Sequence, residues 1–183
     1  VEERGVTVSQ RSKEYAHDYR YFPEPDLPPL AISRAWVEEI RSRMPELPEA
    51  RRNRYMREYG LPAYDASSLT ASKPTADFFE KVIALKGLDG DTLRQRAKAA
   101  ANWMLGEVAR LLNASGVELE KSLLRPEHLS ELLDIVDSGT LSTTMAKTVW
   151  EETFATGKAP VQVVREKGLA QISDASSIEP AVD

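Results

Sequence analysis

Apolar residues recur three and four positions apart along most of this 183-residue chain, and this spacing constrains the fold more than any other feature. One side of an α-helix repeats about every 3.6 residues, so the spacing predicts amphipathic helices and a mainly α fold. The longest run predicts a helix over about 92–113, with Asp91 as its cap and the tetrapeptide Asn113-Ala114-Ser115-Gly116 as its end. Its expected inward stripe consists of Leu93, Ala97, Ala100, Met104, Val108 and Leu111.

Shorter helices are expected before this run. Ser33 is placed to cap the first of them and Pro45 to stop it, because proline cannot continue a helix. Pro48 suits the first turn of the next helix, which ends at Gly60. The expected helices cover about 34–44, 48–59, 63–69 and 75–86. The expected inward residues are Val37, Ile40 and Met44, beside Trp36, in the first helix, and Phe78, Phe79, Val82, Ile83 and Leu85 in the last.

A change of composition after about residue 121 predicts a compact three-helix unit, with a soft boundary near 118–124. Each helix has a favourable starting residue and is followed by a glycine, which tolerates the left-handed backbone at a helix end. The starting residues are Pro126, Ser142 and Pro160, and the glycines are Gly139, Gly157 and Gly168. The residues expected to face inward are Leu129, Leu132, Leu133, Val136, Ala146, Val149, Trp150, Phe154, Val161 and Val164.

The N-terminal part differs from this helical pattern. The segment HDYRYFPEPDLPP, residues 17–29, holds three aromatic residues and four prolines. Residues 1–22 show the only alternation typical of a strand, and the prolines that follow favour a stiff, extended backbone. We therefore expect an extended arm here. The chain starts Val1-Glu2-Glu3 without Met, and we expect it to be a piece of a longer protein.

Composition and charge exclude several classes of function. The chain contains no cysteine, which rules out thiol catalysis, Cys-ligated zinc and disulfides. No run approaches the roughly 18 apolar residues that a membrane-spanning helix needs. The formal net charge of −5 argues against a nucleic-acid footprint over the whole chain but leaves room for a local one.

Few residues suggest catalysis or metal binding. The turn Gly87-Leu88-Asp89-Gly90 lacks the Lys-Ser/Thr end of a phosphate-binding loop. His128 lies in the first turn of a predicted helix and is interpreted as a surface or capping residue. His17 adjoins Asp18 and precedes further carboxylates, but an extended arm does not bring such groups to one point. We therefore expect no metal site.

One basic stretch stands out, residues 51–57 (RRNRYMR), with four arginines and no acidic residue. Arginine suits bidentate phosphate contacts and stacking on bases. On a helix, Tyr55 and Tyr59 would share one side, with arginines spread over the other. A solvated helix face with pairs such as Arg54–Glu58 explains the charges equally well.

A second group of cations lies near the predicted helix ends in the last unit. It consists of Lys147, Lys158, Arg165 and Lys167. These side chains are candidates for a second phosphate-facing patch. Cations are also common near helix C-termini because of the helix dipole, so the pattern favours neither interpretation.

A series of short motifs runs along the whole chain. The most specific is RSKE at 11–14 followed by HDYRYFPEPDLPPL at 17–30. The others are Leu47-Pro48-Glu49 with the arginine stretch, Tyr64-Asp65-Ala66 with Leu69-Thr70, Phe78-Phe79-Glu80, ANWMLGE at 101–107, SGTLS at 138–142, Ala146-Lys147, Thr156-Gly157 and GLAQISD at 168–174. Together and in this order they resemble the B subunit of the bacterial and organellar glutamyl/aspartyl-tRNA amidotransferase.

The resemblance implies an ATP-dependent, glutamine-hydrolysing amido-ligase of protein biosynthesis. Such an enzyme converts Glu-tRNA(Gln) to Gln-tRNA(Gln), Asp-tRNA(Asn) to Asn-tRNA(Asn), or both. The B subunit uses ATP and Mg²⁺ to phosphorylate the carboxylate esterified to tRNA. Ammonia from glutamine hydrolysed by the A subunit displaces the phosphate, and a small C subunit supports the pair. The implied location is the bacterial cytoplasm, with the organellar matrix as the eukaryotic alternative, and neither a membrane nor DNA is an expected partner.

The resemblance also implies a division of this chain. Residues 1–30 would be the C-terminal arm of a β-containing cradle (kinase) domain, 31–120 a helical domain, and 121–183 the N-terminal half of a tRNA-binding tail. Most phosphorylating residues would lie upstream, so this part alone is expected to be inactive and to bind no ATP or Mg²⁺. The catalytic candidates, which would serve equally well to lock the cradle to the helical domain, are His17, Asp18, Tyr19 and Arg20. The expected tRNA-binding residues are Arg51, Arg52, Arg54, Arg57, Lys147 and Lys158.

Two other functions fit parts of the sequence. An independent helical protein-interaction module without nucleic acid would treat the arginines as a solvated face, but it has no account of HDYRYFPEPDLPP. A helix-turn-helix DNA binder over 126–167 ranks last, because its second helix is poor in the Arg, Asn and Gln that contact bases.

Overall fold

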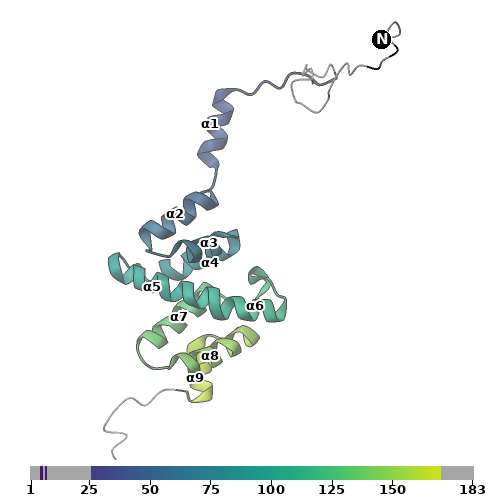
Figure 1. The fold of residues 1–183 in the computed structure, drawn as a ribbon. Helices are drawn as coiled ribbons and strands as arrows, with labels where there is room; N and C mark the ends of the chain where they lie inside the picture. Colours follow the sequence, from purple (N-terminus) through teal and green to yellow (C-terminus); the bar gives the residue numbers. More distant parts are fainter. Residues whose placement is uncertain (1–4, 6, 8–25, 170–183) are drawn as a thin grey trace, which may run out of the picture. The chain divides into compact units, whose positions relative to one another are not determined.

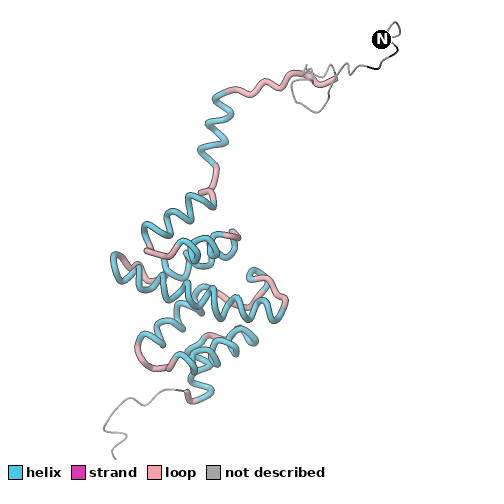
Figure 2. Tube along the Cα trace, viewed as in Figure 1, coloured by secondary structure: helices cyan, strands magenta, loops and turns pink. Residues whose placement is uncertain are grey.

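The computed structural model describes Gly5, Thr7 and residues 26–169. Residues 26–169 form helices joined by short loops, and the structure contains no strand there (Figures 1 and 2). The mainly α prediction is thus confirmed for the described part, whereas most of the predicted extended arm lies outside the described residues. The chain divides into two units, Val1–Met44 and Pro45–Asp183.

The first unit contains helix α1, Arg34–Arg43. It begins as predicted, because the Ser33 hydroxyl accepts a hydrogen bond from the Trp36 amide at 3.1 Å. The prediction that its apolar residues face inward is wrong for the described residues, since none of the helix is buried. Trp36, Val37, Ile40 and Met44 remain 47%, 39%, 43% and 49% exposed.

The second unit opens with α2 (Pro48–Glu58), α3 (Ala63–Thr70) and α4 (Lys73–Ala84), each packed against the next. Helix α4 begins slightly before the predicted Thr75, because Ser72 supplies the cap by accepting from the Thr75 amide. Phe78, Phe79, Val82 and Ile83 are buried as expected. Leu85 is 48% exposed, contrary to prediction, because it lies in the cap position beyond the last turn.

The predicted long helix exists but is not uniform. It consists of α5 (Gly90–Trp103), a π-helical turn (Met104–Val108) and α6 (Ala109–Ser115). Its N-cap residue is Asp89, and Asp91 lies in the first turn instead of capping the helix. Gly116 ends it at φ 67°, as the sequence predicts. In Figure 1 the long helix lies between α2–α4 and α7–α9, and it buries its predicted Ala97, Ala100, Met104 and Val108.

The last helices begin where proline and serine predict: α7 (Pro126–Asp137), α8 (Thr143–Thr156) and α9 (Pro160–Lys167). Of the predicted inward residues, Trp150 is fully buried, whereas Val136, Phe154 and Val161 are only half-buried. Helix α7 packs against α4 and α5 as well as against α8 and α9. One core therefore runs from Tyr55 to Val164, and packing is continuous across the predicted boundary near 118–124.

Candidate nucleic-acid interface

Two arginines of the basic stretch on α2 turn toward α4. Arg51 donates from Nε to Glu80 at 2.8 Å and from Nη2 to Asp77 at 2.6 Å, and its side chain is only 13% exposed. Arg54 donates to Glu46 at 2.7 Å and to the same Glu80 carboxylate. Both guanidinium groups are therefore already bound by carboxylates of their own unit.

Glu80 is the centre of this cluster. It accepts hydrogen bonds from Arg51, Arg54 and, at 3.0 Å, the hydroxyl of the fully buried Tyr55. Burial raises the pKa of Glu80, but the hydrogen bonds from the two arginines and Tyr55 outweigh it and leave the pKa below its ordinary value. Hydrogen bonds to carboxylates in turn raise the pKa of Arg51 and of Arg54. Glu80 is therefore ionised at neutral pH, and its bonds to the two guanidinium groups connect α2 to α4.

The predicted division of α2 into a tyrosine side and an arginine side is only partly right. Tyr55 and Tyr59 do share a side, with ring centroids 5.3 Å apart. Arg54 lies on that side too, because its guanidinium is 5.4 Å from the Tyr55 ring centroid and donates to the Tyr59 hydroxyl at 3.0 Å. The surface pair Arg54–Glu58 does not form, and Glu58 pairs with Arg57 instead.

Arg57 points into solvent, whereas Arg52 is half-buried in a groove with Ser67 and Thr70 of α3. The side chains of Arg52 and Arg57 are 39% and 72% exposed. Arg52 lies 3.8 Å from Glu49, and Arg57 lies 2.9 Å from its neighbour Glu58. Exposed ion pairs of this kind contribute little, roughly 0–1 kcal/mol, so either guanidinium can exchange its carboxylate for a phosphate at small cost.

The lysines near the other end of the unit are exposed but paired. Lys147 lies 2.7 Å from Glu107, which also accepts from Arg110, and hydrogen bonds from these two cations lower the pKa of Glu107. Lys158 donates to Glu166 at 2.6 Å, and this bond raises the pKa of Lys158. In the predicted second patch, Lys147, Lys158 and Lys167 are each matched by a carboxylate, whereas Arg165 is exposed and pairs with no carboxylate of the described residues.

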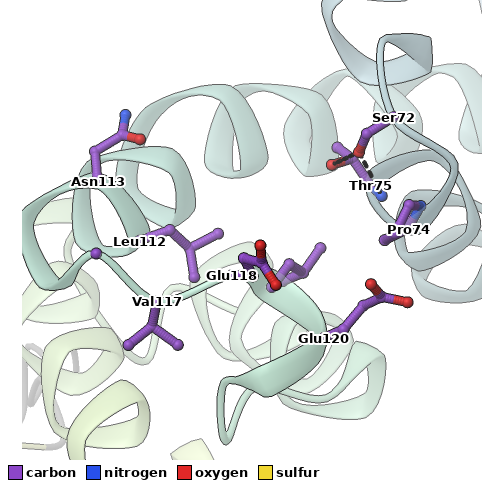
Figure 3. A pocket seen from close by; sticks show the side chains of 10 residues that line it. Ser72, Pro74, Thr75, Leu112, Asn113, Val117, Glu118 and Glu120 are labelled. Atoms are coloured by element: carbon purple, nitrogen blue, oxygen red, sulfur yellow. Dashed lines mark hydrogen bonds between the residues drawn. The ribbon is translucent and has the colours of Figure 1, made fainter.

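An open groove at the start of α4 is lined by acidic side chains and not by basic ones. Its volume is about 570 Å³, and its lining includes Ser72, Leu112, Glu118 and Glu120 but no basic side chain. Figure 3 shows the two carboxylates at this groove, opposite the α4 cap. Carboxylates repel phosphate, so this face is unsuited to a nucleic-acid backbone.

A buried arginine that the sequence did not single out joins α5 to α7. Arg96 is 5% exposed and donates to the Ser130 carbonyl oxygen. It also pairs with Asp134 at 3.0 Å and Asp137 at 3.2 Å. No local pattern marks Arg96, because its partners lie more than thirty residues away in sequence.

The interpretation of His128 as a surface or capping residue is wrong. The side chain is 2% exposed, and its Nε2 accepts a hydrogen bond from Arg125 at 3.0 Å. Burial, and then the charge of Arg125, lower the pKa of His128. The imidazole is therefore neutral at pH 7 and packs as part of the α7 core.

The remaining sequence-based candidates fall elsewhere. His17, Asp18, Tyr19 and Arg20 lie outside the described residues, so their role stays a prediction. Among the residues that the structure does describe, no group of three or more His, Asp or Glu is placed to hold a metal ion. Within the same ranges, every helix is too short or too polar to cross a membrane.

Comparison with known proteins identifies the family. Residues 77–183 match the model of the GatB domain, and residues 1–38 match that of the GatB/GatE catalytic domain.

Proteins named as the B subunit of aspartyl/glutamyl-tRNA(Asn/Gln) amidotransferase are similar to this chain along its whole length. Those of Carboxydothermus hydrogenoformans and Caldicellulosiruptor saccharolyticus are 50% identical over 100% and 99% of this chain, and that of Geotalea daltonii is 52% identical over 98%. The chain spans 36–37% of these relatives' length. Since the first model covers more than half of the chain, this protein belongs to the GatB family.

Proposed function

We propose that this chain is the tRNA-binding and domain-linking part of the B subunit of an aspartyl/glutamyl-tRNA amidotransferase. The observation that carries the proposal is the identity of about half of all residues, over the whole chain, with relatives that bear this name. In the complete enzyme, the aminoacyl group on tRNA would be phosphorylated with ATP and amidated with ammonia from glutamine. The alternative of an independent protein-interaction module does not account for this similarity.

The geometry of α2 suggests how the chain contributes. Arg51 and Arg54 hold α2 against α4 through Glu80, which fixes the direction of the outer face of the helix. The half-buried Arg52 and the exposed Arg57 lie on the two flanks of that face. Guanidinium groups on a rigid helix give phosphate contacts a defined position, because less side-chain and backbone freedom is lost on binding. We assign Arg52 and Arg57 to tRNA and Arg51 and Arg54 to the support of the helix.

Lys147 and Lys158 are the second proposed tRNA contacts. Each is 39–51% exposed and shares its carboxylate partner with a second donor, Arg110 for Glu107 and Gln162 for Glu166. A phosphate that took over either lysine would leave that carboxylate still hydrogen-bonded, which lowers the cost of the exchange.

The partners and cofactors of the whole enzyme belong to the proposal as well. They are the A and C subunits, tRNA(Gln) or tRNA(Asn), ATP and Mg²⁺, in a bacterial cytoplasm. Among the described residues, no group of three or more His, Asp or Glu is placed to hold a metal ion. We assign the described residues to binding and orienting tRNA.

A chimera tests this function. Residues 45–183 of this chain would replace the matching part of the Carboxydothermus relative, and the chimera would be assembled with that organism's A and C subunits. We expect amidation of Glu-tRNA(Gln) at a rate within about tenfold of the parent. A matched chimera with Arg52→Ala and Arg57→Ala should raise the KM for tRNA more than it lowers kcat. An assembled, folded chimera without amidation would contradict the proposal.

A further inference from the structure

Helix α1 presents an apolar face that no described residue of its unit covers. Trp36, Val37, Ile40 and Met44 are each 39–49% exposed. At about 100° per residue these four side chains fall within an arc of roughly 100° on one side of the helix. The face is therefore a continuous stripe and not a scatter of single apolar residues.

The other side of α1 is polar, and its charged side chains pair with one another. Arg41 pairs with Glu38, and Arg43 lies 3.0 Å from Glu39. The Ser42 hydroxyl donates to the Glu39 carbonyl oxygen at 2.8 Å. Because its polar side chains already pair with one another, such a helix gains most by burying its apolar face against another surface.

The occupant of that face can be inferred from the family comparison. The catalytic-domain match ends at residue 38, inside α1, so the first turn of the helix belongs to the catalytic-domain model. The relatives are also much longer, with this chain spanning 36% of the Carboxydothermus protein. We propose that the Trp36–Val37–Ile40–Met44 face docks on the catalytic domain of the longer protein. This rests on the proposed function in one respect, that the longer protein carries its relatives' catalytic domain.

The position of α1 in the sequence gives this docking a consequence. The residues after it, Pro45 to Leu47, lead directly into α2, and Glu46 among them is bonded to Arg54 at 2.7 Å. Hydrogen bonds from Arg54 lower the pKa of Glu46, so this bond is ionised at neutral pH. If α1 is docked and Arg54 holds Glu46, few residues of the connection between the catalytic domain and the tRNA-binding unit can move freely. The docking face would thus set how far bound tRNA can move relative to the catalytic site.

Hydrogen exchange in the full-length protein tests the docking directly. We expect the amides of α1 to exchange about tenfold or more slowly in the full-length protein than in the present chain. Ile40→Glu should abolish that difference, because a carboxylate cannot enter an apolar interface unpaired. The matched control is Ser42→Glu on the polar face, which should leave exchange unchanged.

Amidation by the same full-length variants separates this inference from the function itself. Ile40→Glu should slow amidation about tenfold while Ser42→Glu leaves it unchanged. Equal protection of α1 in the present chain and in the full-length protein would overturn the docking, whatever the activity. The two ideas can also separate in the other direction. If Ile40→Glu abolishes the protection of α1 but the full-length protein shows no amidation, the docking is supported and the proposed function is contradicted.

Discussion

Two ion-pair centres hold the second unit together, and they are built in opposite ways. Between α2 and α4 the centre is an anion, Glu80, bonded to two arginines that are 13% and 24% exposed. Between α5 and α7 the centre is a cation, Arg96, whose carboxylates Asp134 and Asp137 are 42% and 64% exposed. At the first centre the two arginines are more buried than Glu80 itself. At the second centre Arg96 is buried and its two carboxylate partners are exposed to solvent.

The difference decides what happens when a centre is removed. Charges left behind in water are rehydrated, but charges left behind in a buried place are not. Loss of Glu80 would remove one of the two carboxylates that each half-buried guanidinium contacts, leaving Arg51 with Asp77 and Arg54 with Glu46. Loss of Arg96 would leave two solvated carboxylates and would also remove the desolvation penalty of Arg96 itself. The anionic centre should therefore matter more to stability than the cationic one.

The largest effect is expected for Glu80→Ala. It should lower the free energy of unfolding by about 2 kcal/mol, since Arg51 and Arg54 each lose one of two carboxylate partners in a half-buried place. Chemical denaturation of the present chain measures the change. The control is Glu58→Ala, which removes an exposed partner of Arg57 and should cost less than about 0.5 kcal/mol. Equal losses for Glu80→Ala and Glu58→Ala would show that the Glu80 centre contributes no more to stability than an exposed ion pair.

A smaller loss is expected for Arg96→Met, about 1–2 kcal/mol by the same measurement. Methionine keeps most of the packed volume, and the remaining cost is the Ser130 carbonyl oxygen, which loses its donor. Arg94→Met, two residues earlier on the exposed side of α5, is the matched control and should be near neutral. A loss for Arg96→Met larger than that for Glu80→Ala would reverse the ranking of the two centres.

The pH dependence of unfolding tests whether the charge of Glu80 stabilises the α2–α4 junction. Because the folded pKa of Glu80 is lowered from 4.5, its ionised form stabilises the fold above that pH, and the contribution is lost as pH falls through the folded pKa. The difference in unfolding free energy between wild type and Glu80→Gln should be constant near neutral pH and shrink below about pH 4.5. A difference that stays constant down to pH 3 would show that the charge of Glu80 is not what stabilises the junction.

The helix ends followed from the sequence because their causes are local. Ser33, Ser142 and Gly116 act within a few residues, through a hydroxyl that accepts an amide hydrogen bond or a left-handed backbone. The periodic apolar stripes likewise predicted most of the core.

The orientation of the charged side chains did not follow, because its causes are distant in sequence. Arg51 and Arg54 turn inward toward a carboxylate 29 and 26 residues away, which no helical projection of α2 includes. The density of arginines in residues 51–57 therefore overestimated the exposed charge. Of the four arginines in this stretch, only Arg52 and Arg57 are left for a ligand at small cost.

The most direct test of this account is the salt dependence of unmodified tRNA(Gln) binding to the present chain. Arg52→Ala with Arg57→Ala should reduce the magnitude of the slope of log K against log salt by about 1–2, without changing the melting temperature. The control, Arg41→Ala with Arg43→Ala on α1, removes the same charge and should leave the slope nearly unchanged. An unchanged slope for the α2 variant, or an equal change in both, would contradict the assignment of the outer face of α2 to tRNA.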